Sequence, residues 1–276
     1  MKIAIASGKG GTGKTTVSVN LARTMSVQVQ LLDCDVEEPN AHLFLCGNRV
    51  KEEIVHIPIP QVDEALCDGC CECGKFCAYN AIVTFGTAPL IFPEMCHGCG
   101  GCTLVCPTKA ITEVGRRIGV IETMESENIT LIGGRLDVGV AMAPPLIREV
   151  KKRLQDNLPA ILDAPPGTSC PVIAAIRDTD MVLLVTEPTP FGLNDLTLAV
   201  DMVRALQIPF GVIVNRMGSG DDRVHHYCEK EDIPILLEIP DDRRIAESYS
   251  RGILMVDALP QYRELFQRLI QKTEVI

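Results

Sequence analysis

Eight residues near the beginning of the chain have the types and the spacing that bind phosphate. The segment Gly8-Lys9-Gly10-Gly11-Thr12-Gly13-Lys14-Thr15 fits the pattern G-x-x-x-x-G-K-[ST], in which backbone N–H groups surround phosphate oxygens. In that pattern Lys14 reaches the β- and γ-phosphates, and the Thr15 hydroxyl holds Mg²⁺. Apolar residues predict a buried strand at 2–6 and a helix at 16–25, whose N-terminus adds positive potential. The predicted nucleotide-binding residues here are Gly8, Gly10, Gly11, Thr12, Gly13, Lys14, Thr15 and Thr16.

A second lysine, Lys9, directly follows the first glycine, where an ordinary phosphate loop needs no cation. The resulting sequence G-K-G-G-T-G-K-T resembles the deviant phosphate loop of the MinD/ParA/Mrp/nitrogenase-iron-protein ATPases, and the resemblance covers essentially the whole chain. It implies that ATP is bound and hydrolysed by a homodimer. It also implies that Lys9 reaches across the dimer interface to the partner's nucleotide, so both Lys9 and Lys14 are expected to be catalytic.

Carboxylates follow two predicted strands, at the edge where a doubly wound sheet places its ligand. Asp35 lies just past the predicted strand 27–33, and the family resemblance implies that it orients the attacking water and helps to organise Mg²⁺. Asp33 is interpreted as structural. Asp163 ends the apolar strand 160–163 at the Walker B position, near Mg²⁺. The sequence D-x-P-P-G that begins there resembles the second switch segment of Mrp-type members.

The resemblance also implies an adenine site in the second half of the chain. Asn215 comes at the end of the predicted strand 210–214 and is followed by Arg216, and in the family the Asn of a V-x-N-[RK] strand end hydrogen-bonds the adenine. Pro240 and Asp241 follow another predicted strand, and the corresponding family loop packs against the base.

Cysteine is the outlier of the composition, with 13 among 276 residues. One run is Cys67-x-x-Cys70-x-x-Cys73-x-x-x-Cys77, and the other is Cys96-x-x-Cys99-x-x-Cys102-x-x-x-Cys106. Each fits the bacterial ferredoxin pattern, and every cysteine of the second run lies 29 residues after its counterpart (67 to 96, 77 to 106). The constant interval indicates an internal duplication.

In two-cluster ferredoxins the fourth cysteine of each run ligates the other cluster. The resemblance therefore implies two [4Fe–4S] clusters, one held by Cys67, Cys70, Cys73 and Cys106 and the other by Cys96, Cys99, Cys102 and Cys77. A pair of zinc-binding knuckles is the alternative. Cys71 lies outside both sets and is interpreted as a spare thiol, although its position beside Cys70 leaves a different ligand choice open. His97 is expected to be exposed.

The alternation of strands and helices predicts an α/β fold with a doubly wound, mostly parallel sheet of the P-loop NTPase type. A bacterial 2[4Fe–4S] ferredoxin-like domain is expected to be inserted at 58–115, between ATPase segments 1–57 and 116–276. The prolines in Ile57-Pro58-Ile59-Pro60 are interpreted as an exit from the sheet. Strands are expected at 118–121 and 129–132, and a helix at 146–155. The amphipathic segment 259–272 is expected to pack on the sheet, the alternative being a membrane-holding helix like that of MinD.

Composition limits the classes of partner. A net charge of −10 argues against nucleic acid, which normally requires a basic face. No apolar run reaches the roughly 18 residues of a membrane-spanning helix, and no signal peptide is evident, so we expect a cytoplasmic protein without stable membrane insertion.

The leading hypothesis is a slow, partner-stimulated ATPase that binds ATP, Mg²⁺ and two [4Fe–4S] clusters. Its nucleotide-gated dimer would transfer electrons to a partner protein or support metal-cofactor assembly on one. One alternative is an Mrp-type cluster carrier, although the late C-x-x-C pair of such carriers is absent and only Cys228 occurs there. Another is a Min/Par-like positioning ATPase with structural or sensory clusters. Cys170 lacks the companion cysteine of the nitrogenase iron protein and is expected to be a small buried residue.

Overall fold

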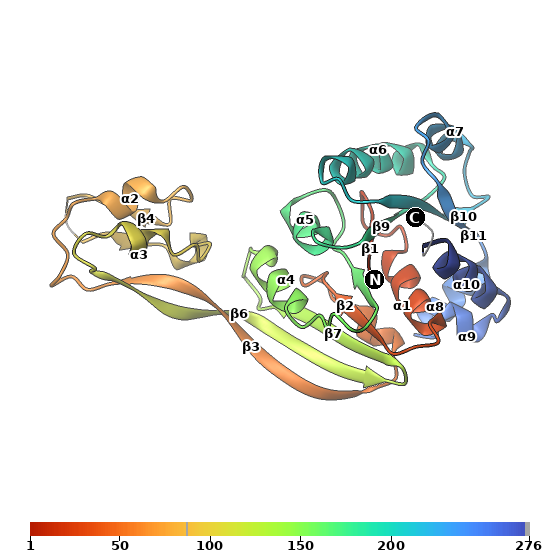
Figure 1. The fold of residues 1–276 in the computed structure, drawn as a ribbon, viewed down its shortest axis with the longest axis horizontal. Coiled ribbons are helices and arrows are strands. Elements are labelled where there is room, and N and C mark those ends of the chain that lie inside the picture. Colours follow the sequence, from red (N-terminus) through yellow and green to blue (C-terminus); the bar gives the residue numbers. More distant parts are fainter. Residues whose placement is uncertain (87, 274–276) are drawn as a thin grey trace. The chain divides into compact units, whose positions relative to one another are not determined.

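The computed structural model describes residues 1–86 and 88–273 (Figure 1). Within these residues nine strands form one sheet, in the order β11-β10-β9-β1-β8-β2-β7-β6-β3. The strands are β1 (Lys2–Ala6), β2 (Val29–Asp33), β3 (Asn48–Val62), β6 (Ile111–Ser126), β7 (Ile129–Leu136), β8 (Ala160–Asp163), β9 (Met181–Thr186), β10 (Phe210–Met217) and β11 (Ile235–Pro240). The pairs from β11 through to β7 are all parallel, which confirms the mostly parallel α/β sheet.

The centre of the sheet is apolar on both faces, because helices connect its parallel strands. Every residue of β2, β8 and β9 is buried. Apart from α2 and α3, which are described below, the α-helices are α1 (Lys14–Thr24), α4 (Ala143–Lys151), α5 (Cys170–Ile176), α6 (Pro190–Ala205), α7 (Arg223–Lys230), α8 (Arg243–Ser250), α9 (Met255–Ala258) and α10 (Gln261–Thr273). The helix expected at 146–155 begins earlier, at Ala143, and Pro144 and Pro145 occupy its first turn, where their missing N–H groups cost nothing.

Helix α10 packs on the core, as the sequence predicts. Its residues Tyr262, Phe266 and Leu269 are buried within the hydrophobic core that also includes β1, β2 and α1. Lys272 donates a hydrogen bond to the backbone carbonyl of Leu236 in β11 (2.8 Å). Among the described residues, no helix is both long and apolar enough to cross a membrane.

The chain divides into two compact units. The first comprises Met1–Glu52, Ile121–Arg135 and Ile147–Ile276, and the second comprises Glu53–Val120 and Leu136–Leu146. Strands β3 and β6 each begin in one unit and end in the other. The predicted exit from the sheet at Pro58 is therefore wrong, because β3 continues through Pro58 and Pro60 to Val62. Proline is tolerated there because β3 is the edge strand of the sheet.

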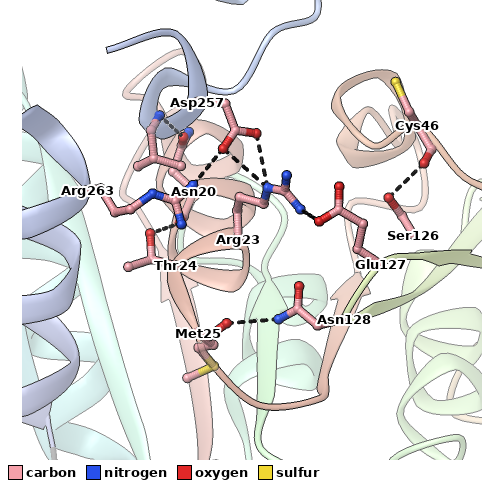
Figure 2. A network of polar contacts seen from close by, with 11 residues as sticks. Asn20, Arg23, Thr24, Met25, Cys46, Ser126, Glu127, Asn128, Asp257 and Arg263 are labelled. Carbon is pink, nitrogen blue, oxygen red and sulfur yellow. Dashed lines mark hydrogen bonds and ion pairs between the residues drawn. The ribbon is translucent and has the colours of Figure 1, made fainter. Parts of the chain in front are cut away.

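The two strands expected at 118–121 and 129–132 are longer, and they form one hairpin. Strands β6 and β7 are neighbours joined by Glu127 and Asn128, and Glu127 adopts a left-handed conformation (φ 52°). Figure 2 shows how this turn is attached to α1. Asn128 donates to the carbonyl of Met25 (2.9 Å), and Arg23 pairs with both Glu127 and Asp257.

The second unit contains an internal structural repeat. It contains α2 (Glu72–Phe76), β4 (Ile82–Val83), β5 (Leu90–Ile91) and α3 (Gly101–Val105), with a small core of Cys73, Ile82, Cys102 and Ile111. The bounds of α3 lie 29 residues after those of α2 (72 to 101, 76 to 105). The duplication seen in the sequence thus extends to its secondary structure.

Candidate nucleotide site and cysteine-lined cavities

The phosphate loop connects β1 to α1 in the first unit, as the motif predicts. Gly13 precedes α1 in a left-handed conformation (φ 96°), and a Cβ there would lie 2.4 Å from Nδ2 of Asn215. No side chain caps the N-terminus of α1, and its first turn holds no acidic residue. The unpaired N–H groups and the positive end of the helix dipole are therefore left for an anion.

A cavity of about 420 Å³ opens where the parallel strands end. Its lining contains Gly10, Gly11, Gly13, Lys14, Thr15, Thr16, Asp35, Glu38, Asn40, Pro166, Asn215, Arg216, Pro240, Asp241, Asp242, Ile245, Ala246 and Tyr249. Most of the predicted nucleotide residues meet here, including the expected adenine residues Asn215, Pro240 and Asp241. Gly8, Lys9 and Thr12 lie outside this lining.

Asp163 lies beneath the phosphate loop at the end of β8 and is fully buried. Its Oδ2 accepts a hydrogen bond from the Thr15 hydroxyl (2.6 Å), so the two predicted Mg²⁺ residues are in contact. Its Oδ1 accepts from the hydroxyl of Ser18 (3.1 Å), which also lies 3.0 Å from the Lys14 carbonyl. Burial raises the pKa of Asp163 to about 6, against the opposing effects of Thr15, Lys14 and Ser18.

Ser18 was not predicted as a site residue, because it lies outside the phosphate-loop motif. The available signal was a small polar residue four positions after Lys14, among the apolar residues of an expected buried helix face.

Asp33 and Asp35 have different environments. Asp33 is buried, and its carboxylate accepts from the backbone N–H groups of Asp35 (3.2 Å), Asn40 (3.0 Å) and Ala41 (3.0 Å). It thereby shapes the loop after β2, which suits the expected structural role. Asp35 lines the cavity beside Lys14. Burial raises the pKa of Asp35 to about 6 and lowers that of Lys14, while the attraction between the two charges opposes both shifts.

Lys9 is part of the phosphate loop and contacts an acidic residue of its own chain. Its Nζ is 3.4 Å from Oε2 of Glu187, and the other carboxylate oxygen of Glu187 is 2.8 Å from Arg216. Glu187 is almost buried and follows β9. No local sequence pattern marks Glu187 as functional, because its partners Lys9 and Arg216 are distant in the chain. Asn215 donates to the Thr12 carbonyl (2.8 Å) and so links β10 to the phosphate loop.

The eight predicted cluster cysteines surround two separate cavities in the second unit. The first cysteine cavity is lined by Cys67, Cys70, Cys71, Cys73 and Cys106, and the second by Cys77, Cys96, Cys99 and Cys102. The fourth cysteine of each run therefore lines the cavity of the other run, as in the expected ligand sets. Among residues 1–86 and 88–273, no group of three or more His, Cys, Asp or Glu side chains is placed to hold a single metal ion.

Each cysteine cavity has a backbone N–H group directed at a sulfur atom. The N–H of Gly98 points at Sγ of Cys96 (3.4 Å), and the N–H of Ala110 at Sγ of Cys106 (3.3 Å). Such contacts favour a negatively charged sulfur. The 13 cysteines are all free thiols. Cys170 is exposed at the first turn of α5, so the expectation that it is buried is wrong, because only the opposite face of this short helix meets the core.

Comparison with known proteins identifies the nucleotide-binding part. Residues 3–255 match the model of the CobQ/CobB/MinD/ParA nucleotide binding domain. The uncharacterized protein MJ0579 of Methanocaldococcus jannaschii is 33% identical over 262 residues, which cover 91% of this chain and 90% of that protein. An iron-sulfur cluster carrier protein of Pyrococcus horikoshii is 25% identical over 298 residues, covering 100% of this chain and 87% of the carrier.

Several solved structures have a fold similar to that of this chain. The cell division ATPase MinD of Pyrococcus furiosus superposes with a TM-score of 0.63 at 23% identity, covering 99% of this chain and 98% of that one. MinD of Pyrococcus horikoshii, solved with Mg-ADP, gives a TM-score of 0.61 at 23% identity, with 99% and 95% covered. These likenesses establish the MinD-like P-loop fold.

Proposed function

This chain belongs to the CobQ/CobB/MinD/ParA nucleotide-binding family, and we propose that it is an ATP-hydrolysing iron–sulfur protein. Its nucleotide state would control electron transfer to a partner protein, or metal-cofactor assembly on one. The observation that carries the proposal is the pair of cysteine cavities, each bordered by four ferredoxin-type cysteines with the fourth exchanged. They belong to a different unit from the phosphate loop.

In the first unit, a few residues in and beside the cavity would suffice for phosphoryl transfer. Lys14 and the N-terminus of α1 would neutralise the phosphates, while Thr15 and the adjoining Asp163 would hold Mg²⁺. Asp35 orients the attacking water. Charge neutralisation and positioning supply most of the catalysis in this reaction, so a cavity with these few groups is sufficient for slow hydrolysis.

In the second unit, the eight cysteines would hold two [4Fe–4S] clusters, which supply one-electron transfer when bound. The protein's own contribution is to supply thiolates and to direct N–H groups at sulfur, as Gly98 and Ala110 do. A complete ferredoxin ligand set favours retained clusters over transferred ones. Binding of the clusters would also stabilise this unit, whose hydrophobic core is small.

A homodimer that closes on ATP would require Lys9 to leave Glu187 before it reaches a partner's nucleotide. The matched pair Lys9→Ala and Lys2→Ala tests this, because Lys2 is a lysine of the same unit whose Nζ pairs with the exposed Asp156, away from the nucleotide cavity. With MgATP, sedimentation should detect dimers for wild type and Lys2→Ala. If Lys9→Ala also formed dimers under the same conditions, Lys9 would not be needed at the dimer interface.

The decisive experiment measures whether nucleotide binding changes the reduction potentials of the clusters. After anaerobic reconstitution, iron analysis should give about eight iron atoms per chain. A redox titration followed by EPR, without nucleotide and with MgADP or MgATP, should then give potentials that differ between nucleotide states. In Lys14→Ala the potentials should be the same in all three conditions. Identical potentials in the wild type would exclude nucleotide control of electron transfer.

A cluster carrier is the second candidate, favoured by relatives that are named iron-sulfur cluster carrier proteins and align along the whole chain. This function predicts that an apo-ferredoxin mixed with the loaded protein acquires clusters in the presence of a chelator that traps free iron. If the clusters stay bound throughout, the electron-transfer proposal is strengthened. Complete transfer on ATP addition would favour the carrier.

A further inference from the structure

The internal duplication allows the two cysteine cavities to be compared residue by residue. Positions 29 residues apart share even their unusual backbone conformations. Gly69 and Gly98 both have positive φ angles (70° and 63°), as do Asn80 and Lys109 (53° and 55°). Differences between the linings therefore reflect the side chains and not the path of the chain.

The most consequential difference is at Cys71, which occupies the place of Gly100. Both residues precede a short helix in the left-handed region, with φ 65° for Cys71 and 71° for Gly100. Glycine is the ordinary residue for this conformation, which a Cβ disfavours. The substituted side chain is also a metal-binding one, and it lines the first cysteine cavity. Five cysteines thus surround the first cavity, whereas four surround the second.

Cys71 is best placed to substitute for its neighbour Cys70. Both line the same cavity, but Cys70 is exposed whereas Cys73 is buried and Cys71, Cys67 and Cys106 are partly buried. The Cys71 thiol is near the Gly69 carbonyl (3.3 Å), a weak contact that a stronger ligand bond would replace. Water reaches Cys70 most easily among these thiols, so a bond from Cys70 is the easiest to exchange.

We propose that Cys71 is an alternative ligand of the iron–sulfur group in the first cysteine cavity and can take the place of Cys70. This rests on the proposed iron–sulfur function. In the exchange, the Cys71 thiol gives up its proton and bonds to the iron that Cys70 leaves, and the Cys70 thiolate takes up a proton. One Fe–S bond forms as another breaks, so no electron is gained or lost.

The second cavity has four cysteines and no counterpart of the Cys71 thiol. There the rings of Tyr79 and His97 stack with centroids 3.6 Å apart, and both residues line the cavity. The equivalent residues at the first cavity are Thr108 and Asp68, which form no such pair of rings. The first site thus has an extra thiol and lacks the stacked rings, and it is the site at which ligation can change.

The test exchanges the distinguishing residue between the two repeats. Cys70→Ala, Cys71→Gly, the double variant, Cys99→Ala and the pair Cys99→Ala with Gly100→Cys are each reconstituted anaerobically as full chains. Iron, sulfide and EPR spectra are then measured. A Cβ at Gly100 would lie 3.2 Å from Oε1 of Glu113, the end of a flexible side chain, so there is space for the cysteine. The left-handed backbone at Gly100 would strain it, as it does Cys71 in the first repeat.

We expect Cys70→Ala and Cys71→Gly each to retain the iron of the wild type and both EPR signals. The double variant should lose iron and the signal of the first cluster. Cys99→Ala should lose the iron of the second cluster, and adding Gly100→Cys to that variant should restore it. Loss of iron in Cys70→Ala equal to that of the double variant would overturn the proposal. Wild-type protein with far fewer than about eight iron atoms would instead contradict the proposed function itself.

Discussion

Ser18→Ala offers a quantitative test of how the phosphate site is organised. The change removes one hydrogen bond to the fully buried Asp163 carboxylate, whose pKa is about 6. A hydrogen bond to a charged group contributes roughly 1.5–3 kcal/mol, and 1.36 kcal/mol corresponds to one pKa unit. Loss of the bond should therefore raise the pKa of Asp163 to roughly 7–8 in the nucleotide-free protein.

The expected consequence is a pH-dependent loss of Mg²⁺-nucleotide affinity. Only ionised Asp163 suits Mg²⁺, and at pH 7 its ionised fraction would fall from about 90% to roughly 10–50%. Affinity at pH 7 should thus fall by roughly two- to tenfold, and at pH 9 it should return almost to that of the wild type. The assay is equilibrium binding of a fluorescent ATP analogue at both pH values, with and without Mg²⁺.

Thr24→Val provides the matched control. Thr24 is on the same helix and its buried hydroxyl donates only to the Asn20 carbonyl (2.8 Å), so removing that hydroxyl leaves Asp163 untouched. Its affinities should match the wild type at both pH values. An equal loss for Ser18→Ala at pH 7 and pH 9, or a loss without Mg²⁺, would refute the assignment of Asp163 to the metal.

Three further changes test other parts of the molecule. Lys14→Ala should abolish nucleotide binding in an equilibrium assay and leave iron content unchanged; concurrent loss of iron would contradict the separation of the two sites. Burial raises the pKa of Asp33 to about 8, so the folded protein holds a proton there that the unfolded chain releases near pH 4, and stability falls as pH rises towards 8. Between pH 6 and 8 the free energy of unfolding of the wild type should fall by up to about 1.4 kcal/mol per pH unit relative to that of Asp33→Asn, measured by anaerobic unfolding. If the two proteins showed parallel dependences on pH, the effect would arise from another group. Asn128→Ala removes two hydrogen bonds to backbone carbonyls and should cost about 1–3 kcal/mol, whereas Gln28→Ala, which loses one exposed bond, should unfold almost as the wild type does.

The nucleotide site was largely predictable because its determinants are local. The glycines and Lys14 stand within eight consecutive residues, and the strand before them and the helix after them follow from short apolar patterns. The grouping of the cysteines was predictable in two steps. Spacing within a tight loop brings three thiols of each run to one cavity, and the ferredoxin pattern implies that the fourth is exchanged. Asp163 required only the recognition that an acidic residue ends a buried parallel strand.

The remaining features depend on contacts between distant segments. Glu187 meets Lys9 only because β9 lies beside β1, and no local pattern marks that pairing. The passage of β3 through Pro58 and Pro60 was missed because prolines normally end strands, and the edge position that permits them is a property of the whole sheet. Likewise, the exposure of Cys170 depends on how the short α5 is oriented, which its sequence does not specify.

The pairing of β3 with β6 has a consequence for the entropy of the folding chain. These strands are neighbours in the sheet, and Arg49 in β3 pairs with Glu122 in β6, so the polypeptide leaves the first unit and returns to it at adjacent positions. The pairing of β3 with β6 closes the intervening segment into a loop, and the entropic cost of that closure grows only slowly with the length inserted. Residues 53–120 can therefore vary in length, or fold later, without changing which segments of the nucleotide-binding unit must find one another.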